Sequence, residues 1–319
     1  MKSLKSKLVI IGVGHVGSAV LNRAIAFQLA NEIVLIDMDE KKAFGEALDS
    51  SHATPCNYSQ NINVHIGDYS ECKDAGVIII AAGPSIMPGE NLDRLVLAER
   101  NIAVIHDIMP QITHYTKDAV IIMITNPLDV TTYCAAKCFD YPENRLFGTG
   151  TTLETLRFKR IIANHYNVDA KDVQGYMLGE HGNSAFPAWS LLNIGGIPAD
   201  QLDKFFNKSE SLDRQEVAKA VVQVAYDVLN FKGYTNTGIA MGACRLAKAV
   251  LGNERSILPV STPLKGEYGL TNVALSLPSL ISENGIERRF EVNLPTDELE
   301  KLHFSANSIK GVLLANKLI

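Results

Sequence analysis

Cysteine is scarce in this chain, and no two cysteines form a C-x-x-C pair. The 319 residues include five cysteines, an odd number spread thinly along the sequence. This distribution excludes a disulfide-stapled secreted scaffold and the usual zinc-binding spacings, and it favours reduced thiols in the cytoplasm. Cys134 and Cys138 stand at i and i+4 of a predicted helix and could pair on a metal ion, but small buried apolar side chains are the favoured interpretation. The sequence therefore predicts no metal site.

Positive charge is not in excess, and long hydrophobic runs are lacking. Lysine and arginine number 30 against 35 aspartates and glutamates, a net charge of -5, so the chain lacks the cationic surface that binds nucleic acid or an anionic membrane. No stretch reaches the roughly 18 apolar residues of a transmembrane helix. Lys2, Lys5 and Lys7 precede an apolar run, as in a signal peptide, but glycines and His15 interrupt it and no cleavage site closes it. We expect a cytoplasmic protein that acts on a small molecule.

The first half of the sequence alternates short β-branched runs with helix-length segments. Near-continuous apolar strands separated by amphipathic helices are typical of βαβ units, in which helices cover both faces of a parallel sheet. The first half is therefore predicted to be an α/β domain with a doubly wound parallel sheet of the Rossmann kind. The predicted strands are Leu8–Ile11, Ile33–Ile36, Val64–Ile66, Val77–Ala81 and Val120–Thr125.

The pattern changes after about Gly148, where longer helices alternate with scattered strands. This half is predicted to be mixed α+β and to end in a capped amphipathic helix. We expect two domains, residues 1–148 and 149–319. The predicted elements of the second half are helices over Leu153–Tyr166, Leu212–Asn230 and Thr296–Lys317, and strands over Val173–Leu178, Ser256–Ser261 and Leu275–Ile281.

A glycine-rich turn follows the first predicted strand directly. Gly12, Gly14 and Gly17 form a G-x-G-x-x-G motif that leads into helical apolar spacing over Ser18–Ala30. Such glycines allow a tight turn and close approach of a pyrophosphate to a helix N-terminus. Asp37, twenty residues after Gly17, ends the second strand, where a carboxylate can bind a ribose 2′-hydroxyl and repel a 2′-phosphate. NAD is the predicted cofactor, although Asp37 could instead cap its strand.

One histidine lies between two glycines in the segment Leu178–Ser184. The sequence around His181 gives little reason for a structural histidine. An imidazole can give and take a proton near neutral pH. A surface or hydrogen-bonded structural histidine is the alternative that this segment alone leaves open. His181 is therefore a candidate general acid and base.

These motifs together resemble those of the lactate/malate dehydrogenase superfamily of L-2-hydroxy acid dehydrogenases, over nearly the whole chain. Within it, the chain looks most similar to the L-2-hydroxyisocaproate dehydrogenases, which share the segment around His181 with Asn183 where most lactate dehydrogenases have Asp. The resemblance implies an NAD-dependent oxidoreductase that forms a homodimer or homotetramer. The matching motifs are Gly12–Gly17, Thr125–Pro127, Gly148–Gly150, Leu153–Arg157, Gly179–Gly182 and Lys232–Thr235.

The resemblance also implies a role for each catalytic side chain. His181 would donate the proton to the ketone oxygen, with a pKa near neutrality. Arg157 would hold the substrate carboxylate in two parallel hydrogen bonds, and Arg94 would stabilise the charge that develops on the carbonyl oxygen. Arg100 competes with Arg94 for this role, because the preceding loop is longer than in common lactate enzymes. A surface salt bridge is the alternative for Arg157 and for Arg94. Glu154 stands where the family normally has Asp, the carboxylate that orients the imidazole.

Further ligand contacts are implied by the same resemblance. Asn126 would contact both the substrate oxygen and the cofactor, and its alternative is a turn residue before Pro127. Thr235 would line the substrate pocket. Val16 and Gly83 would join the glycine turn in binding the cofactor.

Ile86 sets the expected substrate preference. It aligns where lactate enzymes have Gln and malate enzymes have Arg, so a second substrate carboxylate would be buried without a partner, at a cost of several kcal/mol. Each extra buried methylene gains about 0.8 kcal/mol. We therefore predict 2-oxo acids with apolar side chains, such as 2-oxoisocaproate. The alternatives are an L-lactate dehydrogenase that acts on pyruvate and, with less support, a malate dehydrogenase or a non-catalytic nucleotide-binding protein.

Overall fold

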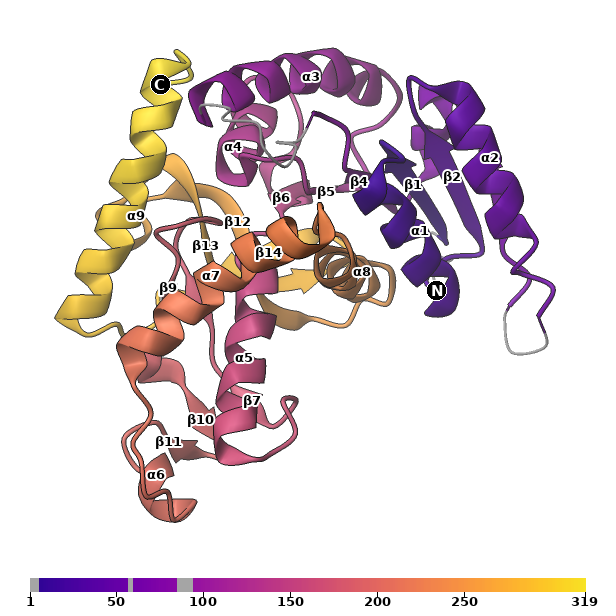
Figure 1. The fold of residues 1–319 in the computed structure, drawn as a ribbon. Coiled ribbons are helices and arrows are strands. Elements are labelled where there is room, and N and C mark those ends of the chain that lie inside the picture. Colours follow the sequence, from indigo (N-terminus) through magenta and orange to yellow (C-terminus); the bar gives the residue numbers. More distant parts are fainter. Residues whose placement is uncertain (1–5, 57–59, 85–93) are drawn as a thin grey trace.

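A mixed sheet runs through the centre of the molecule (Figure 1). The structure is a computed structural model that describes residues 6–56, 60–84 and 94–319. Within these ranges the main sheet has nine strands in the order β14-β13-β12-β6-β5-β4-β1-β2-β3. The strands β1 to β6 are parallel and have the order of a doubly wound dinucleotide-binding sheet, which confirms the predicted fold class. They are β1 (Lys7–Ile11), β2 (Glu32–Ile36), β3 (Asn63–Ile66), β4 (Val77–Ile80), β5 (Val120–Met123) and β6 (Leu146–Gly148).

Helices cover both faces of this parallel sheet, because alternate strand residues point to opposite sides. Leu8 and Ile10 of β1 pack into the hydrophobic cluster that includes α1, α2 and α8. Val9 and Ile11 pack into the cluster on the other face, with α3 and α4. Both strand faces are therefore apolar, as the continuous β-branched runs predict. The covering helices are α1 (His15–Ala26), α2 (Glu40–Ser51), α3 (Arg94–Tyr115), α4 (Leu128–Lys137) and α8 (Thr237–Leu251).

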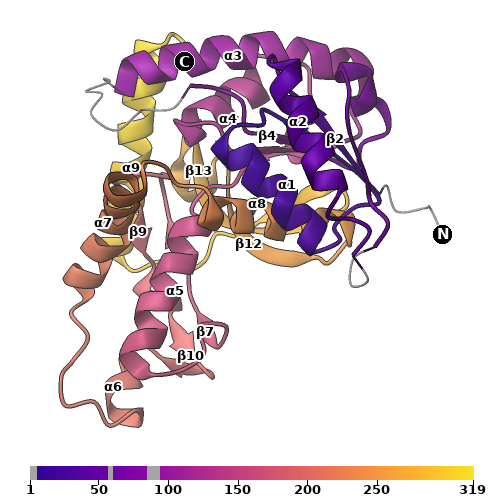
Figure 2. The same ribbon diagram turned by 45° about the vertical axis from the view of Figure 1, so that its right-hand side comes forward.

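The second half extends the same sheet with antiparallel strands. Ser261 of β12 pairs with Gly148 of β6, and β13 and β14 follow outward. In Figures 1 and 2, α3 runs across the top of the molecule, whereas α5 and α6 extend toward the bottom. These elements are β12 (Ser256–Lys265), β13 (Thr271–Ser282), β14 (Gly285–Arg289), α5 (Thr152–Tyr166), α6 (Leu202–Phe205), α7 (Arg214–Lys232) and α9 (Thr296–Ala315).

Short segments complete the second half. The two small sheets contain β7 (Val173–Gln174), β10 (Asn193–Ile194) and β11 (Ile197–Pro198) in one, and β8 (Met177–Leu178) and β9 (Phe186–Pro187) in the other. The 3-10 turns are η1 (Tyr69–Asp74), η2 (Glu143–Arg145), η3 (Trp189–Leu191) and η4 (Glu267–Gly269). No helix of the described residues combines the length and apolar character needed to cross a membrane.

The predicted strands of the first half are confirmed to within two residues, but two predictions in the second half are wrong. The single strand predicted over Val173–Leu178 is two strands, β7 and β8, because the two pieces are separated at Gly175 and Tyr176 and pair with different partners. The terminal helix begins at Thr296 as predicted, but without a side-chain cap, since Pro295 is at its N-cap. Glu298 instead lies buried and accepts hydrogen bonds from the backbone N–H and the hydroxyl of Ser190.

Candidate active site

A cleft of about 670 Å³ lies at the carboxyl edge of the parallel strands, where ligands of doubly wound sheets bind. The segments that follow β1, β4 and β5 line it from the first half, and α5, the His181 segment and the region after α7 line it from the second half. Eight of the residues that the sequence singled out meet there: Gly14, Val16, Gly83, Asn126, Glu154, Arg157, His181 and Thr235.

The glycine turn is built by close backbone contacts. Gly12 has φ of +91°, and a Cβ on it would lie 2.4 Å from the backbone nitrogen of Ala82. A Cβ on Gly17 would lie 1.9 Å from the carbonyl oxygen of Gly12, so only glycine fits at either position. Gly14 differs, since its Cβ position has nothing within 4 Å, and as N-cap of α1 it provides no side-chain cap. The uncapped start of α1 therefore faces open space in the cleft, which fits the pyrophosphate of NAD.

Asp37 stabilises the same turn from the end of β2. Its Oδ2 accepts a hydrogen bond from the backbone N–H of Val13 at 2.6 Å, and its Oδ1 accepts one from that of Asp39 at 3.0 Å. The strand-capping role considered from the sequence is therefore present. The half-buried carboxylate also places negative charge beside the glycine turn.

Glu154 and His181 form the central pair of the cleft. Glu154 lies buried in the first turn of α5, and its Oε1 and Oε2 lie 3.0 and 3.1 Å from Nδ1 of His181. Nδ1–H therefore donates to this carboxylate, which leaves Nε2 as the nitrogen that can exchange a proton with a ligand. The glutamate reaches the ring despite its extra methylene.

The charges of this pair stabilise each other. Burial lowers the pKa of His181, but the charge of Glu154 and its hydrogen bond outweigh burial and raise the pKa to about 9. This shift is upward from the neutral range that the resemblance implies for His181. Burial also opposes ionisation of Glu154, yet His181 lowers the pKa of Glu154. At pH 7 the pair is an imidazolium and a carboxylate, which suits a proton donor.

Arg157 lies one helical turn after Glu154 and lines the cleft. Its Nη1 is 3.9 Å from Oε1 of Glu154, and its side chain is only 12% exposed. Burial lowers the pKa of Arg157, and the charge of Glu154 opposes this shift. The side chain is thus a cation inside the cleft, unlike the surface salt bridge considered from the sequence. Its planar guanidinium can bind a carboxylate there with two parallel hydrogen bonds.

Asn126 lines the cleft after β5, and a residue that the sequence analysis missed fixes its backbone. Asn101 of α3 is fully buried, and its Nδ2 donates to the carbonyl oxygens of Asn126 at 2.7 Å and of Pro84 at 3.0 Å. The amide thereby connects the segments that follow β4 and β5. Gly83 fits against it, since a Cβ there would lie 2.1 Å from Oδ1 of Asn101.

Asp129 was also missed, and it fixes the backbone of His181. This carboxylate is buried in the first turn of α4. Its Oδ2 accepts from the backbone N–H of His181 at 2.7 Å, and its Oδ1 accepts from the hydroxyl of Ser261 at 2.5 Å. Burial raises the pKa of Asp129 to about 7, against the opposing effect of these partners. The only signal in the sequence is one acidic residue directly ahead of the uncharged segment Val130–Ala136.

Two predicted site residues, Ile86 and Arg94, cannot be assigned to the lining of the cleft. Ile86 lies outside the described residues, and Arg94 is the first residue of α3, with a side chain that is not described. Arg100, the competing candidate, is an exposed residue of α3 and is absent from the described lining of the cleft. At the cleft mouth, His15 and Tyr234 stack with ring centroids 3.9 Å apart, a contact that the sequence did not predict.

Comparisons with known proteins agree over nearly the whole chain. Residues 6–148 match the family model of the lactate/malate dehydrogenase NAD-binding domain, and residues 151–315 match that of the lactate/malate dehydrogenase α/β C-terminal domain. The chain is 56% identical over 309 residues to the L-lactate dehydrogenase of Selenomonas ruminantium, which covers 97% of each protein. It is 52% identical over 313 residues to L-lactate dehydrogenase 2 of Clostridium acetobutylicum, with 98% of each covered.

A solved structure shows the same architecture. The minor L-lactate dehydrogenase of Enterococcus mundtii in its ligands-bound form superposes with a TM-score of 0.92 at 36% identity, over 98% of both chains. The chain therefore belongs to the lactate/malate dehydrogenase family and is an NAD-dependent oxidoreductase that acts on the CH–OH group of L-2-hydroxy acids.

Proposed function

We propose that this enzyme is an L-lactate dehydrogenase, which interconverts pyruvate and L-lactate. The observation that carries the proposal is the 56% identity to a protein named L-lactate dehydrogenase over 97% of both chains. The preference for larger apolar side chains, predicted from Ile86, has no such support, because the similar proteins are named L-lactate dehydrogenases and Ile86 lies outside the described residues. Reduction of 2-oxoisocaproate is therefore the second candidate.

The proposed mechanism assigns one task to each of the four side chains His181, Glu154, Arg157 and Arg94. Bound NADH supplies the hydride for the keto carbon. The His181 imidazolium donates the proton to the ketone oxygen from Nε2, while Glu154 keeps the ring oriented and stabilises its charge. Arg157 binds the substrate carboxylate, and Arg94 stabilises the developing oxyanion. In lactate oxidation, neutral His181 takes the proton back.

The remaining predicted residues complete the two binding regions. Asn126 contacts substrate and cofactor, Thr235 lines the substrate pocket, and both lie in the cleft. Ile86 would face the side chain of the substrate. The residues that we propose for the cofactor are Gly12, Gly14, Val16, Gly17, Asp37, Gly83 and Asn126. The negative charge of Asp37 disfavours a 2′-phosphate and so favours NAD over NADP.

Residues 1–148 form the proposed NAD-binding domain, and residues 149–319 the proposed substrate domain. We further propose a cytoplasmic homodimer or homotetramer. Light scattering coupled to size-exclusion chromatography tests the assembly, and a monomer under assay conditions would contradict it.

Steady-state kinetics with NADH and three substrates test the function. Pyruvate, 2-oxoisocaproate and oxaloacetate are compared by kcat/KM, and pyruvate is expected to be best. A higher value for 2-oxoisocaproate would replace the proposal with its second candidate, and a higher value for oxaloacetate would also contradict the argument from Ile86. Binding of NADH without turnover of any 2-oxo acid would contradict the catalytic assignment. His181→Ala, which removes the proton donor, serves as the low-activity reference.

A further inference from the structure

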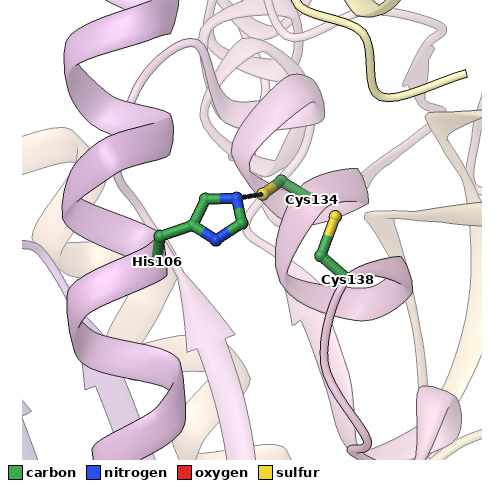
Figure 3. Close-up of side chains that lie close together, drawn as sticks. All are labelled: His106, Cys134 and Cys138. Atoms are coloured by element: carbon green, nitrogen blue, oxygen red, sulfur yellow. Dashed lines mark hydrogen bonds between the residues drawn. The ribbon is translucent and has the colours of Figure 1, made fainter.

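Three potential metal ligands meet between α3 and α4, and none of them lines the cleft (Figure 3). His106 belongs to α3, Cys134 belongs to α4, and Cys138 is the residue at the C-cap of α4. The ligand atoms of the three residues all lie within 4.8 Å of one another. Nε2 of His106 is 3.8 Å from Sγ of Cys134, the contact drawn in Figure 3. The cluster of one imidazole and two thiols therefore lies outside the site that the proposed function uses.

Helix geometry explains how the three groups come together. Residues four apart share one face of a helix, so Cys134 and Cys138 point in the same direction. The histidine comes from 28 residues earlier in the chain, so sequence spacing could not find it. Its neighbour Ile105 is fully buried against the sheet, which fixes this part of α3, and Phe139 contacts the His106 ring edge-on with centroids 5.1 Å apart.

The burial of the three side chains differs in a way that suits an ion at the protein surface. Cys134 is buried, as predicted, whereas Cys138 and His106 are exposed, so the prediction that both cysteines are buried apolar residues is wrong for Cys138. Cys134 is therefore a fixed ligand. The other two side chains have room to adjust, and solvent can reach the ion.

The distances are close to those of a tetrahedral site. Zinc bonds of about 2.3 Å to sulfur and about 2.0 Å to nitrogen separate two sulfurs by about 3.8 Å, and sulfur from nitrogen by about 3.5 Å. The observed 3.8 Å between Cys134 and His106 nearly meets this geometry, and the other separations, all within 4.8 Å, need a contraction of no more than about 1.3 Å. Rotation of the exposed side chains can supply this movement.

We propose that His106, Cys134 and Cys138 bind Zn²⁺, with water as the fourth ligand. Two thiolates and one imidazole are the donors that zinc prefers, and they are poor ligands for magnesium or calcium. Binding converts both thiols to thiolates and releases their two protons to solvent. The ion connects α3 to the end of α4 and stabilises the packing of these helices.

Cobalt titration of the reduced, metal-stripped enzyme tests this site. Co²⁺ substitutes for zinc, and thiolate ligation gives a sulfur-to-cobalt charge-transfer band together with the intense visible bands of tetrahedral cobalt. One equivalent per chain is expected, and Zn²⁺ should displace it. The same samples, melted with and without Zn²⁺, should show a higher Tm with zinc.

Variants of the two exposed ligands locate the site. His106→Ala and Cys138→Ser should each weaken Co²⁺ binding more than about 100-fold. Loss of a group that only hydrogen-bonds to a metal ligand already weakens metal binding roughly 10-fold to 100-fold, and these variants remove a ligand itself. The matched controls are His114→Ala, also exposed on α3, and Cys56→Ser, an exposed cysteine elsewhere. Both controls should bind like the wild type, and all four variants should keep dehydrogenase activity, which shows that they fold. Absence of the charge-transfer band in the reduced wild type, or its persistence in both ligand variants, would overturn the proposal.

Discussion

Nδ1 of His181 lies 3.0 and 3.1 Å from the two carboxylate oxygens of Glu154, so a single buried side chain both orients the imidazole and balances its charge. The resemblance implies that the family normally has Asp where this chain has Glu154. The longer glutamate makes the contact from the first turn of α5, where the helix N-terminus also favours a negative charge.

Replacing Glu154 by glutamine should lower kcat for pyruvate on the order of 10²-fold to 10⁴-fold, with a much smaller change in KM. The amide keeps the size of the side chain but removes the charge that stabilises the imidazolium. Steady-state kinetics at pH 7 measure both constants. Glu154→Asp is the matched control, since it keeps the charge at shorter reach and should retain more turnover. Unchanged turnover in Glu154→Gln would remove this residue from the mechanism.

The pH dependence of the reaction should reflect the raised pKa of His181. If the protonated ring is the proton donor as proposed, kcat/KM for pyruvate should fall as pH rises through about 9, and that for lactate should rise over the same range. In Glu154→Gln the midpoint should move down toward the ordinary histidine value of about 6.5. Identical midpoints in the two proteins would show that Glu154 does not tune His181.

Arg157→Lys should raise KM for pyruvate roughly 10-fold to 100-fold, because a lysine keeps the charge but loses the paired hydrogen bonds of the guanidinium. The Kd of NADH, measured by fluorescence, should stay the same. Arg160→Lys, at an exposed position of the same helix, is the control and should behave like the wild type. A KM unchanged by Arg157→Lys would mean that this side chain does not hold the carboxylate.

Two glycines of the same turn should respond differently to alanine. Gly14→Ala places a methyl group in open space, so its Tm should stay close to that of the wild type, while the Kd of NADH should rise at least about tenfold as the methyl occupies the approach of the pyrophosphate. Gly17→Ala forces a Cβ against the Gly12 carbonyl oxygen and should lower stability by roughly 1–3 kcal/mol. Equal effects of the two substitutions on Tm would contradict this distinction.

Local patterns in the sequence predicted much of the fold, because a buried parallel strand shows itself as a short β-branched run whatever its partners are. The error over Val173–Leu178 arose where one apolar run is divided into two short strands that pair with different partners. Such pairing depends on residues distant in the sequence, and periodicity contains no information about it.

In the candidate site too, residues in short sequence motifs could be predicted, whereas residues that act on distant parts of the chain could not. His181 and the glycine turn are visible as short motifs. Asp129 and Asn101 act through hydrogen bonds to backbone atoms 52 and 25 residues away, so their roles appear only in three dimensions. His106 is a further case, since it is an ordinary surface histidine until α3 packs against α4.

The proposed domain boundary near Gly148 does not separate two hydrophobic cores. α1 belongs to the proposed NAD-binding domain and α8 to the proposed substrate domain, yet Leu21 of one and Leu246 of the other are fully buried in a single hydrophobic cluster. A hybrid enzyme that joined the halves of two relatives at this point would pair helix faces selected against different neighbours. Exchange of substrate specificity between relatives therefore requires the contacting faces of α1 and α8 to be transferred together.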